Sequence, residues 1–169
     1  MDPYSIIQTD KHELTEAYMS DYIMDLRTIV GHRPLLQVGA SVIVVDSENR
    51  ILLQLRSDNH CWGYAGGSVE LDEVVEDAAK RELFEETGLL AEKLELFGVF
   101  SGKDTHYIYP NGDEVSNVEI VYVCKHYTGT LKCQKGEVDD LKFFRVDEIP
   151  KNISAPIRKA LNNWIEQNT

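Results

Sequence analysis

Apolar residues near the N-terminus recur at helical spacing until Gly31, and Pro34 follows shortly after. The residues of this pattern are Leu14, Tyr18, Tyr22, Leu26 and Ile29. They predict a helical extension over residues 1–34, with one apolar face that needs a partner surface. We expect this extension either to lie on the following domain or to form a contact between two copies of the chain in a homodimer.

Short apolar runs predict the strands of the domain that follows. Two such runs within residues 35–56 predict two strands joined by a polar turn at Asp46–Asn49. The pair Asn111-Gly112 predicts a hairpin between two later strands. The later strands are expected at about residues 94–101, 106–109, 115–125 and 141–146. A glycine-rich segment, WGYAGGSVELDE, is interpreted as a loop.

Two helices are predicted within the same domain. The first runs from about residue 73 to Thr87 and ends at Gly88. The second is capped by Ser154, has Pro156 in its first turn, and buries Ile157, Leu161, Trp164 and Ile165. Helices interspersed with many strands are typical of a layered α/β domain, which we place at residues 35–169.

The first of these helices carries carboxylates on its apolar side. At about 100° per residue, Glu82 and Glu86 fall within the apolar stripe and Glu85 lies on its border. The stripe is formed by Val75, Ala78, Ala79, Leu83 and Leu90. A partly buried pair of like charges about 4 Å apart costs about 4 kcal/mol at an effective dielectric of about 20. Some positive charge must therefore compensate these carboxylates.

A divalent cation is one way to supply that charge. The alternative is a solvated acidic helix end, but such a cluster should lie opposite Val75 and Ala79. Carboxylate ligands favour Mg²⁺ or Mn²⁺, and none of the five histidines has a partner at zinc-site spacing. GYAGGS matches neither common phosphate-binding glycine loop. We expect Gly66 and Gly67 to let the backbone approach the metal, with a carbonyl as ligand.

The composition narrows the partners and the compartment. Twenty-nine acidic and 17 basic residues give a formal charge of −12, which disfavours binding to nucleic acid or to an anionic membrane. A phosphorylated substrate would therefore need local positive charge. The three cysteines form no C-x-x-C pair, and no signal sequence or membrane-spanning run is present in the sequence. We expect a soluble, cytoplasmic protein with free thiols.

Residues 67–89 resemble the complete signature motif of the Nudix hydrolase family, the Nudix box. The matching positions are Gly67, Glu73 and the run RELFEETGL, which ends in Gly88 and Leu89. A looser resemblance extends from about residue 38 to 150. One departure is Ala65, where the family often has proline.

The resemblance implies an α/β/α sandwich with a mixed sheet, and an Mg²⁺- or Mn²⁺-dependent, MutT-like pyrophosphohydrolase activity. Glu82, Glu85 and Glu86 correspond to the metal ligands, together with the carbonyl of Gly67. Arg81 and Glu73 correspond to an ion pair that holds the loop to the helix. The implied reaction uses metal-activated water, and a glutamate acts as general base. It cleaves the diphosphate linkage of a nucleoside triphosphate, a dinucleoside polyphosphate or a nucleotide sugar.

Three further residues are candidates for the base or the substrate site. Glu137, six residues before Phe143, occupies the place of a family glutamate that reaches back to the metals, which makes it the candidate base or a further ligand. Glu119 competes for the role of base, because it interrupts the apolar run VEIVYV, and it could instead contact substrate. Tyr107 lies near a tyrosine typical of dinucleoside polyphosphate hydrolases and could stack on a base.

Three alternative functions would each require a different sequence feature. In an ADP-ribose pyrophosphatase the family marker would be a proline near Asp104–Thr105, and none is present. A non-catalytic nucleotide sensor would be expected to have lost carboxylates of the box, yet all are present. An isopentenyl diphosphate isomerase of the same fold would need a cysteine and a glutamate in its own motif, which the sequence lacks.

Overall fold

A computed structural model describes residues 22–168, which fall into two compact units divided between Gly31 and His32. The first unit contains helix α2 (Tyr22–Val30). Gly31, at φ 61°, closes this helix by donating its N–H to the carbonyl of Arg27 at 2.9 Å. The predicted N-terminal helix is confirmed for residues 22–30, and its part before residue 22 lies outside the described residues.

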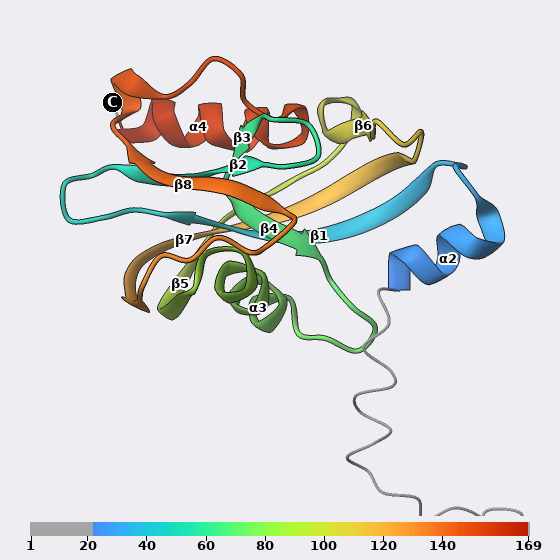
Figure 1. Cartoon of the computed structure of the whole chain (residues 1–169), viewed down its shortest axis with the longest axis horizontal. Coiled ribbons are helices and arrows are strands. Elements are labelled where there is room, and N and C mark those ends of the chain that lie inside the picture. Colours follow the sequence, from blue (N-terminus) through green and yellow to red (C-terminus); the bar gives the residue numbers. More distant parts are fainter. Residues whose placement is uncertain (1–21, 169) are drawn as a thin grey trace, which may run out of the picture. The chain divides into compact units, whose positions relative to one another are not determined.

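The second unit contains a five-stranded mixed sheet with the order β4-β1-β7-β5, in which β6 also pairs with β7 (Figure 1). β1 and β7 are parallel, whereas the other pairs are antiparallel. The strands are β1 (Leu35–Val44), β4 (Ala65–Ser68), β5 (Leu89–Phe100), β6 (His106–Ile108) and β7 (Glu114–Gly129). The predicted hairpin at Asn111-Gly112 joins β6 to β7, with Gly112 at φ 90°.

A second, antiparallel sheet has the order β3-β2-β8. It consists of β2 (Ile51–Arg56), β3 (Trp62–Gly63) and β8 (Val138–Phe144). The polar turn between β1 and β2 is held by Asp46, whose carboxylate accepts the N–H groups of Glu48 and Arg50 at 3.0 and 2.9 Å. This short turn connects two strands of different sheets, because β1 belongs to the five-stranded sheet and β2 to the three-stranded one.

Helices α3 (Val75–Thr87) and α4 (Arg158–Asn168) lie on opposite sides of the sheets (Figure 1). One part of the core contains Ala78, Ala79 and Leu83 of α3, packed against β1. The other part contains Ala160, Leu161 and Trp164 of α4, packed on the opposite face. This arrangement confirms the expected α/β/α sandwich with a mixed sheet.

Several predicted boundaries were wrong, each for a local reason. The glycine-rich segment was predicted as a loop but contains β3 and β4. The prediction missed them because Gly66 and Gly67 hide the alternation by which a strand is recognised. β5 begins at Leu89, earlier than predicted, and charged residues on its exposed face hid this first part. Leu90 is 52% exposed in that strand and does not belong to the helical stripe, because α3 ends at Gly88. β7 and β8 are longer than predicted.

The predicted last helix begins with a 3₁₀ turn, η3 (Ala155–Ile157), in place of an α-helical one. Ser154 precedes this turn but makes no capping hydrogen bond through its side chain, contrary to the prediction. The predicted apolar stripe is confirmed: Leu161 and Trp164 are buried, and Ile157 and Ile165 pack against the same core. The three cysteines are free, as expected. Within residues 22–168, no helix is long and apolar enough to cross a membrane.

Candidate active site

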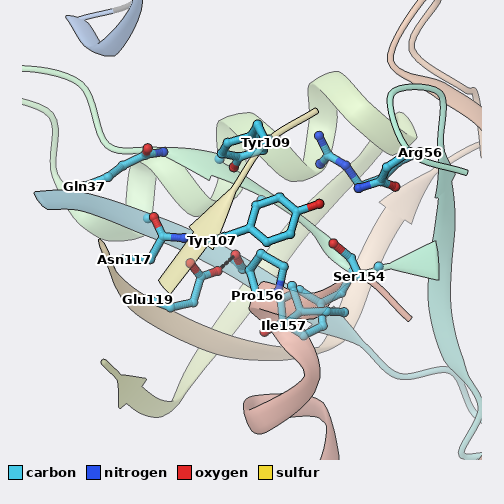
Figure 2. Close-up of a pocket in the computed structure, with 16 residues that line it drawn as sticks. Gln37, Arg56, Tyr107, Tyr109, Asn117, Glu119, Ser154, Pro156 and Ile157 are labelled. Atoms are coloured by element: carbon cyan, nitrogen blue, oxygen red, sulfur yellow. Dashed lines mark hydrogen bonds between the residues drawn. The ribbon is translucent and has the colours of Figure 1, made fainter. Parts of the chain in front are cut away.

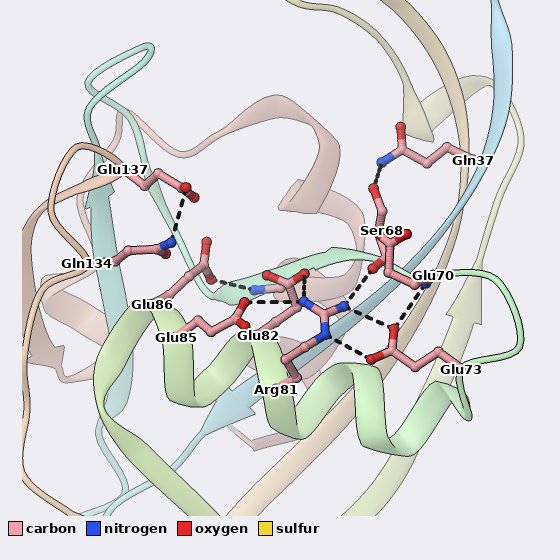
Figure 3. A network of polar contacts seen from close by, with 11 residues as sticks. Gln37, Ser68, Glu70, Glu73, Arg81, Glu82, Glu85, Glu86, Gln134 and Glu137 are labelled. Carbon is pink, nitrogen blue, oxygen red and sulfur yellow. Dashed lines mark hydrogen bonds and ion pairs between the residues drawn. The ribbon is translucent and has the colours of Figure 1, made fainter. Parts of the chain in front are cut away.

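Arg81 lies at the centre of a polar network that connects α3 to the segment before it (Figure 3). Its Nε and Nη2 donate to the two carboxylate oxygens of Glu73 at 2.8 and 3.0 Å. Its Nη2 also donates to the carbonyl of Ser68 at 3.1 Å. The Arg81 guanidinium lowers the pKa of Glu73, so this carboxylate stays ionised. The network therefore fixes the loop between β4 and α3 against the helix.

The same guanidinium compensates two of the helix carboxylates. Nη1 of Arg81 donates to Glu82 at 2.7 Å and to Glu85 at 3.2 Å. A divalent cation was expected to compensate these carboxylates, and Arg81 supplies part of the positive charge from the helix itself. The sequence did not indicate this contact, because a helical wheel shows angles and not how far a long side chain reaches.

Glu86 is the carboxylate that Arg81 does not reach in this network. It is only 4% exposed, and its Oε2 accepts the N–H of Gly66 at 2.8 Å. Burial raises the pKa of Glu86 to about 8, against hydrogen bonds from Gln54 and Gly66 that lower it. Burial also raises the pKa of Glu82, despite its contact with Arg81. The interior of the helix face thus holds carboxylates at an electrostatic cost.

Replacing Arg81 by Gln should lower the free energy of unfolding of the metal-free protein by about 1–3 kcal/mol, because Glu73 and Glu82 lose their charged donor. The matched control is Lys80→Gln, which breaks the exposed pair Lys80–Glu76 at 2.8 Å on the same helix. That change should cost less than about 0.5 kcal/mol. Urea unfolding measures both values, and equal costs would show that the Arg81 network contributes no more than a surface ion pair.

Glycine at position 67 is required by the Glu82 carboxylate. A Cβ on Gly67 would lie within 2.7 Å of both Glu82 oxygens. The backbone of β4 therefore lies next to the carboxylate of Glu82. A metal site that uses both a backbone carbonyl and a carboxylate as oxygen ligands requires this closeness. These all-oxygen donors fit Mg²⁺ or Mn²⁺. Within residues 22–168, no three acidic, histidine or cysteine side chains already form a closed ligand set, and Arg81 engages both Glu82 and Glu85.

Glu137 is exposed and lies in the segment before β8, on the carboxylate side of α3 (Figure 3). This segment is anchored to the helix end by the N–H of Lys132, which donates to the carbonyl of Thr87 at 2.8 Å. Gln134 Nε2 donates to Glu137 Oε1 at 3.1 Å. The charge of Glu137 contributes to the raised pKa of Glu82, so the two carboxylates are close enough to interact. The fold therefore brings Glu137 to the box carboxylates.

A pocket opens beside β4, and Figure 2 shows the side chains that line it. Gly66 and Gly67 belong to its lining and also adjoin Glu86 and Glu82, so β4 connects the pocket to the carboxylates. Both sequence candidates for substrate contact, Tyr107 and Glu119, line it. The other lining residues are Gln37, Gly39, Ser41, Arg56, Asn59, Gly63, Tyr64, Tyr109, Asn117, Ser154, Pro156 and Ile157.

The pocket has an aromatic part, formed by Tyr107 and Tyr109, and a carboxylate part, formed by Glu119. The rings of Tyr107 and Tyr109 meet edge to face, with centroids 4.9 Å apart. Glu119 accepts a hydrogen bond from Ser41 Oγ, and burial raises the pKa of the carboxyl. Thr105 is buried and donates to the carbonyl of Asn117 at 2.7 Å, which holds the segment before β6 against β7.

Four residues of the site were not found from the sequence: Gln54, Arg56, Tyr109 and Asn117. Gln54 is fully buried and interrupts the apolar strand ILLQLR, which is the same signal that pointed to Glu119. Asn117 lies two residues before Glu119 and therefore on the same face of β7. Arg56 and Tyr109 stand at strand ends, where no periodicity distinguishes them.

Comparisons with known proteins agree with this geometry. The chain is 35% identical over 136 residues to an ADP-ribose pyrophosphatase of Methanocaldococcus jannaschii, which covers 78% of this chain and 76% of the relative. It is 43% identical over 121 residues to a MutT-like protein of Streptomyces ambofaciens, covering 72% and 71%.

A crystal structure of a MutT NUDIX hydrolase from Burkholderia pseudomallei superposes with a TM-score of 0.65 at 29% identity. It covers 80% of this chain and 99% of that one. The family model of the NUDIX domain matches residues 35–164, which include the α3 carboxylates and every residue that lines the pocket. The chain therefore belongs to the NUDIX domain family.

Proposed function

We propose that this protein hydrolyses the diphosphate linkage of a nucleoside-diphosphate derivative with the help of Mg²⁺ or Mn²⁺. Nudix hydrolases act on such compounds and generally need divalent cations. The observation that carries the proposal is the position of Glu86, a buried carboxylate next to Glu82 that β4 connects to a pocket with aromatic walls.

The metal would be held by Glu82, Glu85, Glu86 and the carbonyl of Gly67. When bound, it supplies positive charge for the phosphate oxygens and makes a water molecule more acidic. Arg81 holds Glu82 and Glu85 in this structure, so both carboxylates would have to give up part of their contact with Arg81 to hold a metal. Glu73 binds the other edge of the guanidinium and would keep Arg81 in place.

Arg56 is the cationic side chain among the residues that line the pocket. Asp58 binds its Nε and Nη2 at 3.0 and 3.1 Å, which leaves Nη1 outside this pair. The Arg56 charge opposes the burial that raises the pKa of both Glu86 and Tyr109, so the side chain is near enough to act on a box carboxylate and on the aromatic wall. In a chain of net charge −12, Arg56 is the residue suited to orient a substrate phosphate.

Glu137 is proposed as the general base. An exposed carboxylate near the box can take the proton of the attacking water. The water oxygen forms a new bond to phosphorus, and the bridging phosphorus–oxygen bond breaks. A nucleoside monophosphate and the other phosphorylated half leave the site.

ADP-ribose is the second candidate substrate, because a relative of that name shares 35% identity over most of both chains. The missing proline near Asp104–Thr105 argues against it. Inclusion of ADP-ribose beside nucleoside triphosphates and nucleotide sugars in one hydrolysis screen separates these substrate classes.

Activity should depend strictly on a divalent metal. Glu85→Gln should reduce turnover with Mg²⁺ or Mn²⁺ by orders of magnitude, on the order of 10²-fold or more, because a proposed ligand loses its charge. It should also weaken Mn²⁺ binding measured by electron paramagnetic resonance without substrate. Activity that persists in excess chelator would refute the metal requirement, and unchanged Mn²⁺ affinity would remove Glu85 from the ligand set.

A further inference from the structure

Glu119 presents its carboxylate into the pocket from β7 (Figure 2). It lies beside Gly39 of β1 in the parallel ladder. A Cβ on Gly39 would stand 2.7 Å from Glu119 Oε2, so the glycine makes room for the carboxylate. Ser41, two residues further along β1, donates to the other oxygen, Oε1. Three neighbouring positions on two strands thus fix the direction of this carboxylate.

Glu119 receives little compensation from the protein itself. Within residues 22–168, its carboxylate accepts a hydrogen bond from Ser41 at Oε1, accepts none at Oε2 and forms no ion pair. A partly desolvated carboxylate gains from further donors, and a ligand in the pocket is in a position to provide them. The ligand group that meets Glu119 should therefore carry hydrogen-bond donors, and a phosphate is excluded by its charge.

The walls around Glu119 suit a flat ring. Tyr107 and Tyr109 contribute aromatic surface from β6 and the residue that follows it, and Pro156 and Ile157 contribute apolar surface from η3. Nucleobases stack on tyrosine with little dependence on sequence. The hydrogen-bonding edge of such a ring would then face Glu119 and Asn117, while Arg56 offers its charge to the phosphates.

On the basis of the proposed hydrolase function, we infer that this pocket binds the nucleobase of the substrate and that Glu119 selects a guanine-type edge. An ionised carboxylate is an acceptor at both oxygens. Guanine presents two adjacent donors, N1–H and the N2 amino group, which match it. Adenine presents an acceptor, N1, beside its amino donor, so one of the two contacts becomes repulsive. Hypoxanthine keeps N1–H but lacks the second donor.

The test measures binding of nucleoside monophosphates to the metal-free protein by NMR titration. GMP should bind at least about tenfold more tightly than AMP, and IMP should lie between them. Deoxy-GMP should bind within about twofold of GMP, because the base and not the ribose diol meets Glu119. Glu119→Gln should weaken GMP binding by about tenfold and favour AMP, since an amide matches the donor and acceptor of adenine.

The matched control is Glu95→Gln, because Glu95 is an exposed glutamate of β5 that lies outside the pocket. This substitution should change none of these affinities. Equal binding of GMP and AMP, or no effect of Glu119→Gln, would overturn the inference. Deoxy-GMP as weak as IMP would assign Glu119 to the ribose and also overturn it. No turnover is needed for these titrations, so their result is independent of whether the proposed hydrolysis is correct.

Discussion

Glu86→Gln is expected to reduce kcat by about 10²–10⁴-fold while the protein remains folded. The amide keeps the shape of the side chain and can still accept the N–H of Gly66, but it lacks the charge that a metal ligand needs. Steady-state hydrolysis with Mg²⁺ and Mn²⁺ measures this loss. Full turnover of Glu86→Gln would contradict the proposed site.

The same substitution should raise the stability of the metal-free protein at neutral and alkaline pH. Burial raises the pKa of Glu86 from 4.5 to about 8, so its carboxyl group prefers to be neutral in the folded state. The neutral Glu86 carboxyl makes its full contribution to the free energy of unfolding below pH 4.5, and this contribution is lost as the pH rises through about 8. Gln has no such loss, so the variant should gain on the order of a few kcal/mol relative to the parent across that interval.

Urea unfolding at several pH values between 4.5 and 8 measures this difference. Glu76→Gln is the control, because Glu76 pairs with Lys80 on the exposed side of the same helix. It should leave both turnover and the pH dependence of stability unchanged. A variant Glu86→Gln that is less stable than the parent at pH 8 would show that ionised Glu86 stabilises the fold.

Glu137→Gln is expected to reduce kcat by about 10²–10⁴-fold with little change in KM, because the attacking water loses its proton acceptor. Folding and nucleotide binding should remain intact, since the side chain is exposed and outside the pocket lining. Glu119→Gln should act differently and mainly raise KM for guanine nucleotides. Stopped assays over a range of substrate concentrations separate the two patterns.

Asp140→Asn is the control for the Glu137 experiment, because Asp140 is a nearby exposed acid whose carboxylate accepts the N–H of Leu141 at 2.8 Å. It should leave kcat unchanged. If Glu119→Gln loses turnover and Glu137→Gln does not, the base belongs to β7 and Glu137 is an ordinary solvated acid. The raised pKa of Glu119 would then belong to the reaction and not only to binding.

The position of the α3 carboxylates followed from helical spacing alone. Glu86 is 4% exposed, the Glu82 side chain is 16% exposed and the Glu85 side chain is 42% exposed, which matches two positions inside the stripe and one on its border. The contact of Arg81 with these groups did not follow, because it depends on rotamers. Gln54 was within reach of the same reasoning, since a polar residue within a buried apolar strand is a strong signal.

Most of the pocket could not be predicted from the sequence. Its walls come from strands of both sheets and from η3, which long-range pairings bring together. The pairing of β4 with β1 places Gly66 beside Ser41, and no local pattern indicates this register. Tyr107 and Glu119 were separate candidates for substrate contact. The sequence did not predict that the pairing of β6 with β7 brings both side chains to one pocket.

The proposed hydrolysis is tested most directly with a nucleotide panel in ¹⁸O-labelled water with Mg²⁺ or Mn²⁺, with products identified by mass spectrometry. We expect a nucleoside-diphosphate derivative to be cut at its diphosphate linkage and one ¹⁸O atom to enter a single phosphate product. Excess chelator should abolish the reaction. Absence of turnover across nucleoside triphosphates, dinucleoside polyphosphates, nucleotide sugars and ADP-ribose, or cleavage without uptake of ¹⁸O, would contradict the proposed function.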